Sequence, residues 1–161
     1  MTLDPSRFPD AVDSQALPWI PIRPGLSFKP LRFLPDLKGY VQLLRVEPGT
    51  LIERHRHTGE VHAYHLAGQR KLLDTGEVVG PGTYVYEPSG NVDSWTVVGD
   101  EPLIAYIVIW GEIEYLDEHD RVTRRASAET ALENYRRHCE STGVDIGALV
   151  GQKRPIGHVA G

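Results

Sequence analysis

The sequence predicts an all-β fold, a sandwich or a barrel, followed by a single helix. Short segments rich in β-branched and aromatic residues follow one another through the central part of the chain, and glycine or proline separates them at short intervals. Many short strands joined by such turns are typical of β-sandwiches and β-barrels. Only one stretch, near the C-terminus, carries apolar residues at a helical period. With 161 residues, the chain is expected to form one domain with a real core.

The first 24 residues are predicted to form an extended N-terminal arm. Proline recurs through this segment, and each proline removes a backbone donor and restricts the residue before it, so a regular helix is not expected. The arm is expected to cover a sheet edge of a neighbouring subunit in a homodimer or a higher closed oligomer. Residues 25–125 are then predicted to form the barrel.

The strands are expected in the order 26–33, 40–46, 51–57, 61–66, 70–74, 83–86, 92–98, 103–110, 114–116 and 121–123. Turn residues lie between them, among them Pro48-Gly49 and the glycine and proline run at 80–82. The C-terminal helix is predicted within residues 126–146. Ser127 is suited to the N-cap and Gly143 to the C-terminal end. Residues 147–161 are rich in glycine and small side chains and are predicted to form a flexible tail.

Composition argues against several classes of function. The net charge is -5, and no lysine or arginine cluster dominates any stretch, so neither nucleic acid nor an anionic membrane is an expected partner. The longest apolar run, residues 103–110, is too short to span a bilayer. The N-terminus is acidic and proline-rich, unlike a secretory signal. A single cysteine, Cys139, excludes an internal disulfide framework and indicates a reduced, cytoplasmic location.

A pair of histidines on one predicted strand is the strongest functional signal. His55 and His57 are separated by one residue, and side chains at i and i+2 of a strand project from the same face. If that face is the inside of a small barrel, the two imidazoles form half of a metal site. Further along the chain, Pro88 and Gly90 turn it back before the carboxylate of Asp93.

These two phrases resemble the two motifs of the cupins. The spacing G-x5-H-x-H from Gly49 matches the first half of cupin motif 1. The spacing G-x5-P-x-G-x2 from Gly82 matches motif 2 as far as Asp93, which stands where the motif has a histidine. The segments "RHRHTGEVHAYHLAG" and "GPGTYVYEPSGNVDSW" are similar to the small single-domain cupins related to 2,4'-dihydroxyacetophenone dioxygenase and the acetylacetone-cleaving enzyme. The resemblance implies a jelly-roll barrel, also called a double-stranded β-helix, and a non-haem iron centre.

The resemblance implies that His55, His57 and Asp93 are the metal ligands and the catalytic centre. Two imidazoles and one carboxylate are the ligand set of the facial-triad iron oxygenases. Fe(II) is the expected metal, and Zn, Ni or Mn are metals that the purified protein can carry. Asp74 is expected as a further ligand or as a partner that orients an imidazole. The loss of the third histidine also permits the opposite interpretation, in which the site no longer binds a metal.

Other residues are candidates for the surroundings of the metal. Motif 1 of the broader family has a glutamate where this chain has Val61. Its neighbour His62 is expected to point away from the metal, unless a bulge after Gly59 reverses the strand. Glu53 alternates with the two histidines, so it is expected either beside the metal or in a surface salt bridge.

Three further side chains are expected inside the barrel. His65 is predicted to be a pocket group or a core histidine. Trp95 and Tyr106 are predicted to belong to the pocket wall or to the core, and the sequence does not separate these roles. A dry pocket lined by aromatic and aliphatic side chains suits an alkyl or aryl ketone.

The sequence therefore predicts a metal-dependent oxygenase that cleaves a carbon–carbon bond of a small β-diketone or α-hydroxyketone with O2. Two alternatives stay open because one cupin scaffold carries several functions. An isomerase or epimerase acting on a small polar molecule would need a protein base, such as His65, and no oxygen. A binding module or sensor, like the metal-binding domain of the ChrR anti-sigma factors, would account for the altered third ligand.

Overall fold

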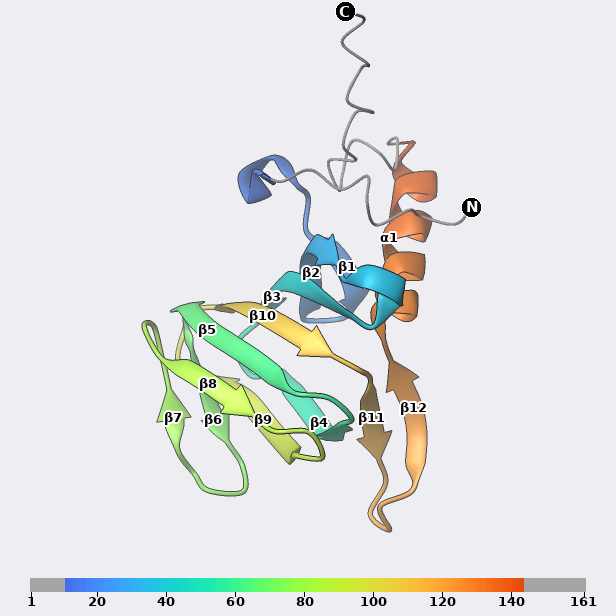
Figure 1. Ribbon diagram of the computed structural model, residues 1–161. Helices are drawn as coiled ribbons and strands as arrows, with labels where there is room; N and C mark the ends of the chain where they lie inside the picture. The colour runs from blue at the N-terminus through green and yellow to red at the C-terminus, as the bar shows by residue number, and fades with distance from the viewer. Residues whose placement is uncertain (1–10, 144–161) are drawn as a thin grey trace, which may run out of the picture.

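The computed structural model describes residues 11–143, which form two antiparallel sheets and one α-helix (Figure 1). The first sheet has the strand order β1-β2-β3-β10-β5-β8, and the second has the order β12-β11-β4-β9-β6-β7. The strands of this part of the chain are β1 (Ile20–Arg23), β2 (Leu26–Phe33), β3 (Gly39–Val46), β4 (Leu51–His57), β5 (Val61–Ala67), β6 (Gln69–Leu72), β7 (Val78–Val79), β8 (Tyr84–Glu87), β9 (Val92–Val98), β10 (Leu103–Trp110), β11 (Ile113–Leu116) and β12 (Val122–Ala126).

The order of the strands is that of a jelly roll. From β3 to β6, and again from β8 to β11, successive strands lie in opposite sheets, so the chain winds around a common interior. Along β10, the residues that face this interior, such as Ala105 and Ile107, are buried, and their neighbours are more exposed. This alternation is the period expected of a strand with one face toward a core. The predicted all-β jelly-roll fold is confirmed.

Helix α1 (Ala128–Thr142) begins and ends at the residues that the sequence predicts. Ser127 and Thr130 form a reciprocal capping box, and Gly143 adopts a left-handed conformation with φ 70° at the C-terminal end. The helix packs against β1, β2 and β12 at one end of the barrel (Figure 1). Its buried residues are Ala128, Ala131, Tyr135 and Cys139.

Several element boundaries differ from the prediction. The strand expected at 70–74 ends at Leu72, and Asp74 lies in the following turn. Within the segment predicted as an extended arm, residues 14–16 form a 3-10 turn, and Ile20–Arg23 form an edge strand of the first sheet. The short strand β7 was not predicted. The division of the chain at residues 24, 125 and 146 stays a prediction, and residues 1–10 and the expected tail at 147–161 lie outside the described residues.

Among residues 11–143, no helix combines the length and the apolar character needed to span a membrane.

Candidate metal centre and its cavity

His55 and His57 lie next to each other on the inner side of β4. Each is buried, and their ring centroids are 4.9 Å apart in an edge-to-face arrangement. The Nδ1 atom of His55 lies 2.7 Å from the carbonyl oxygen of Glu53. Because a carbonyl oxygen only accepts, Nδ1 carries the proton in this contact, and Nε2 of the neutral ring keeps its lone pair. The spacing of the two histidines therefore brings them together on the inner face.

His57 stays neutral at physiological pH. Burial, together with the proximity of His55 and Arg70, lowers its pKa to about 3. Its Nδ1 atom is buried and has no hydrogen-bond partner in the described part of the chain. A neutral imidazole with an unused ring nitrogen is the form in which histidine binds a metal.

Two carboxylates from neighbouring strands lie near the histidines. Asp93 of β9 is the cross-strand partner of His55, and its side chain is buried. Glu87 at the end of β8 is also buried, and its Oε2 atom lies 3.7 Å from Nε2 of His57. Asn91 donates a hydrogen bond of 3.0 Å to the other oxygen of Glu87 and so orients the carboxylate. Burial and the charge of Glu87 raise the pKa of Asp93 to about 6, although Arg70 and His55 act in the opposite direction.

Glu87 lies opposite the position at which cupin motif 1 has its glutamate. The glutamate of cupin motif 1 is replaced by Val61, and the register of β5 with β8 places Val61 directly opposite Glu87. Opposite residues of an antiparallel pair have Cβ atoms only about 5 Å apart. The carboxylate of Glu87 therefore lies one strand away from the position of the motif glutamate. Sequence reasoning missed Glu87, although its alternation with Val85 in a strand before Pro88 was a signal that it faces inward.

Arg70 is a second residue of the candidate site that sequence reasoning missed. Its side chain on β6 is only 4% exposed, and its guanidinium carbon lies 4.9 Å from the ring centroid of Trp95. The Nε and Nη2 atoms have no hydrogen-bond partner among the described residues. Burial lowers the pKa of this guanidinium, and the negative charges of Glu87 and Asp93 oppose that effect. Arginine keeps its proton in proteins, so a buried positive charge faces this cluster.

A cavity of about 120 Å³ lies between the sheets and reaches the polar cluster. Its polar lining includes His55, His57, Arg70, Glu87 and Gln42, with Tyr40, Tyr115 and Trp95 beside them, whereas Asp93 is not among its lining residues. Aliphatic side chains such as Ile52, Val61, Ala63, Ile107 and Ile109 form much of the remaining wall. Ile22 of β1 and Thr130 of α1 also line the cavity and are exposed, which indicates that it opens between these two elements.

The donor types fit a divalent transition metal, but the side chains do not surround one point. The cluster supplies two imidazoles, of which His57 has a buried ring nitrogen without a hydrogen-bond partner, and two buried carboxylates, which is chemistry suited to Fe, Zn, Ni or Mn. Within residues 11–143, however, no three His, Cys, Asp or Glu side chains are grouped so that they could hold a metal ion. Ligation would therefore require side-chain rotations within this cluster.

Glu53, predicted beside the metal or in a surface salt bridge, and Tyr106, predicted in the pocket wall or the core, both point outward. The pairing of β4 with β9 shifts between Ile52 and His55, so both of these residues are buried and the two between them are exposed. This bulge turns the side chain of Glu53 outward, and only its carbonyl oxygen contacts His55. Tyr106 is 39% exposed on the outer face, because Ala105 and Ile107 occupy the inward positions of β10.

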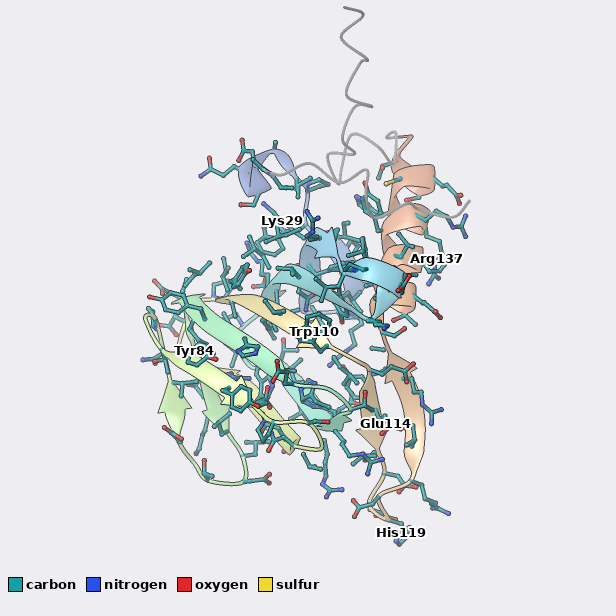
Figure 2. All side chains as sticks on the ribbon, viewed as in Figure 1. Lys29, Tyr84, Trp110, Glu114, His119 and Arg137 are labelled. Carbon is teal, nitrogen blue, oxygen red and sulfur yellow. The ribbon has the colours of Figure 1, made fainter. Side chains whose placement is uncertain are left out.

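Two other predicted residues lie outside the cavity. His62 is on the outer face of β5, where its Nδ1 atom lies 2.6 Å from the hydroxyl of Tyr84, as expected of a regular strand. Tyr84 is labelled in Figure 2 on this face. Asp74 is exposed in the turn after β6, so its carboxylate is not brought to the histidines.

The remaining two predicted residues are buried. Trp95 lines the cavity and supports Arg70. His65 is 1% exposed, its Nδ1 atom donates to the carbonyl oxygen of Thr83 over 2.9 Å, and its Nε2 atom has no partner among residues 11–143. Burial and Arg70 lower the pKa of His65, against the contact with Thr83, so the ring is a neutral group of the interior.

The two wound sheets and the histidine pair of β4 define a cupin barrel. A model of the ChrR cupin-like domain family matches residues 9–114, and the chain belongs to that family. The comparison with curated proteins found no match.

Solved cupin structures share the fold over most of the chain. An RmlC-like cupin protein from Ralstonia eutropha JMP134 is 25% identical, with a TM-score of 0.80 over 87% of this chain and 92% of that one. A cupin-like protein of unknown function from the same organism is 22% identical, with a TM-score of 0.76 over 83% and 86% of the two chains. An acetylacetone dioxygenase from Acinetobacter johnsonii is 14% identical, with a TM-score of 0.67 over 79% and 89%. The predicted likeness to small cupins of this kind is confirmed.

Proposed function

We propose that this protein is a metal-dependent cupin oxygenase that cleaves a carbon–carbon bond of a small ketone with O2. The observation that carries the proposal is a buried polar cluster, in which His55, His57 and Glu87 lie at the wall of a largely aliphatic cavity and Asp93 lies behind them as the cross-strand partner of His55. A polar reactive centre in an otherwise apolar pocket is the usual form of a small-molecule active site. The fold shared with an acetylacetone dioxygenase supports the proposal at the level of architecture.

His55, His57 and Asp93 are the proposed metal ligands, and Fe(II) is the proposed metal. Bound iron would supply Lewis acidity toward two adjacent substrate oxygens and electrons for the reaction with O2. The carbonyl oxygen of Glu53 holds the proton of His55 on Nδ1, so that Nε2 is available as a ligand. Asp93 enters the proposal because it faces His55 across the strand pair.

Glu87 is the proposed proton acceptor. Asn91 holds one of its carboxylate oxygens, and the other faces the ring of His57 across 3.7 Å. A β-diketone or an α-hydroxyketone becomes electron-rich when it loses a proton. A carboxylate at the cavity wall can accept that proton. The aliphatic wall, including Ile107 and Ile109, excludes water from the substrate.

The test combines metal analysis with oxygen consumption. Protein purified without chelator is assayed for iron, and an oxygen electrode records turnover with a panel of diketones and hydroxyketones. We expect uptake that requires both Fe(II) and O2, two product fragments and isotope from labelled O2 in them. Turnover that continues at the same rate under anaerobic conditions would assign the protein to the isomerase class, for which His65 is the candidate base.

A metal-binding or sensory module is the second candidate function. It is favoured by the match to the ChrR cupin-like domain family. A module of this kind would bind metal or a small ligand without oxygen uptake. Parent protein without metal, beside a metal-loaded Asp93→His variant, would favour a site that has lost its original chemistry.

We also propose a homodimer or higher closed oligomer in a reduced, cytoplasmic setting. The outer face of the first sheet carries an aromatic row in which Tyr106, Tyr64 and Tyr84 are cross-strand neighbours. These side chains are between 39% and 58% exposed, and large exposed apolar patches often mark interfaces. Light scattering at micromolar concentration tests the assembly, and a monomer that is unchanged by deletion of the arm would contradict it.

A further inference from the structure

Arg70 is a buried cation whose hydrogen-bonding capacity is largely unused. Its Nε and Nη2 atoms have no hydrogen-bond partner among residues 11–143, although the residue is only 4% exposed. Removing a charged donor from water without replacing its hydrogen bonds is costly. Such a group at a cavity wall indicates a ligand that completes its bonding.

The charges around the cavity point to the sign of that ligand. Arg70 contributes one positive charge, and Glu87 and Asp93 contribute two negative charges. A divalent metal on His55, His57 and Asp93 would leave the whole group with one positive charge in excess. With that metal bound, one monoanion balances the site, whereas the metal-free group already carries one negative charge in excess. A planar guanidinium is geometrically suited to a carboxylate.

The surroundings of Arg70 restrict what the rest of the ligand can be. The face of Trp95 holds the guanidinium, which limits its rotation. The neighbouring cavity wall is aliphatic, and the volume of about 120 Å³ admits only a small molecule. A short carbon chain along this wall would leave its polar end at Arg70 and the metal ligands.

We propose that Arg70 binds the carboxylate of the substrate, so that the substrate is a small oxo acid with an alkyl body. This inference rests on the proposed function, since it assigns the substrate class of the same site. The competing explanation is that Arg70 only balances the charges of Glu87 and Asp93. These explanations differ because a structural cation would affect anionic and neutral ligands alike.

The test compares two ligands that differ in charge and match in shape. Pentane-2,3-dione has a methyl group where 2-oxobutanoate has one of its carboxylate oxygens. Both molecules offer two adjacent oxygens. Calorimetric titration of the full chain, metal-free and loaded with Zn, gives their affinities without any turnover. We expect the parent to bind 2-oxobutanoate at least about 10-fold more tightly, as for a hydrogen bond to a charged group.

Variants of Arg70 separate recognition from structure. Arg70→Gln should weaken the binding of 2-oxobutanoate at least about 10-fold and change the binding of the dione less than about 2-fold. Lys71→Gln is the matched control, because Lys71 is the next residue of β6 and is exposed. It should leave both affinities unchanged. Equal weakening of both ligands in Arg70→Gln, or equal affinities in the parent, would overturn the proposal.

The remaining outcomes keep the two proposals apart. If circular dichroism shows that Arg70→Gln is unfolded, Arg70→Lys keeps the charge but loses the planar fork, and it should still weaken 2-oxobutanoate selectively. Selective binding of 2-oxobutanoate without oxygen uptake would support the role of Arg70 and contradict the oxygenase. Oxygen uptake with the dione that is unaffected by Arg70→Gln, together with no preference for the oxo acid, would support the oxygenase and overturn the role of Arg70.

Discussion

Strands β10 and β4 both line the barrel, but inward and outward side chains alternate regularly along β10 and irregularly along β4. Along β10, burial alternates from Leu103 to Trp110 without interruption. Along β4, a shift in pairing separates the buried residues Ile52 and His55 by two exposed ones. A period of two therefore predicts the facing of side chains in β10 and fails at Glu53 in β4. The comparison teaches that the strand carrying the candidate metal ligands is the irregular one, and bulges are over-represented next to active sites.

The largest expected effect lies on the regular strand. Leu103 of β10 is 1% exposed, so Leu103→Ala should lower the free energy of unfolding by about 3 to 5 kcal/mol, through lost burial and the cavity that remains. Urea denaturation measures this change. Tyr106→Ala on the outward face of the same strand is the control and should cost much less. A similar loss in both variants would contradict the alternation of β10.

The second prediction concerns the pH dependence of β4. The pKa of His57 is lowered to about 3 in the folded protein, whereas the unfolded chain takes up this proton below about pH 6.5. The stabilisation that comes from burying His57 as a neutral ring is therefore fully present above pH 6.5, and it is lost as the pH falls toward 3. For metal-free protein, we expect a loss of roughly 2 to 4 kcal/mol across this window.

Denaturation at several pH values, with His57→Asn as the comparison, isolates this contribution. Asp93 acts in the opposite direction between about pH 3.8 and 6, because its pKa is raised in the folded protein. Because Asp93 is present in both proteins, its effect cancels when the profile of His57→Asn is subtracted from that of the parent. The loss of stability in this difference should therefore be larger than the loss seen in the parent profile alone. Profiles of the same shape would show that the imidazole is not buried in neutral form.

A third prediction sharpens the assignment of the carboxylates. Asp93→Ala should weaken metal binding by more than about 100-fold, more than the change expected for a residue that only orients a ligand. Glu87→Gln should retain metal and lose oxygen uptake, because it removes the proton acceptor and keeps the shape. Asp74→Ala is the control, since its side chain is exposed in a turn. Metal analysis of the variants distinguishes the two assignments. Loss of metal in Glu87→Gln alone would make Glu87 the metal ligand and Asp93 the proton acceptor.

The smallest expected effect lies at the bulge. Glu53 contributes its carbonyl oxygen to His55, and its side chain is exposed, so Glu53→Gln should change stability by less than about 0.5 kcal/mol and leave metal content unaltered. Thermal unfolding and metal analysis measure both quantities. A marked loss of metal would mean that the carboxylate reaches the site and that the strand is regular in solution.

Much of the fold could be predicted from local signals. Glycine and proline turns, the period of the strands and the caps of the helix depend on residues close together in the chain, and Ser127 and Gly143 take their predicted places. The predicted end of the strand at Asp74 was wrong, because the strand ends two residues earlier than its composition suggests. The inward placement of His55 and His57 could also be predicted, because both lie on one strand.

The sequence by itself determined the barrel, the helix and the histidine pair, since each depends on spacing within one segment. Only the tertiary structure decided which distant side chains join that pair. Glu87 enters through its register with Val61, and Arg70 enters because β6 brings it over Trp95. Neither contact can be predicted from local spacing. Cross-strand pairing determines which side chains surround Glu87 and Arg70, and it also sets the dielectric environment that shifts the pKa values of the site. The electrostatics of the site therefore belong to the folded molecule.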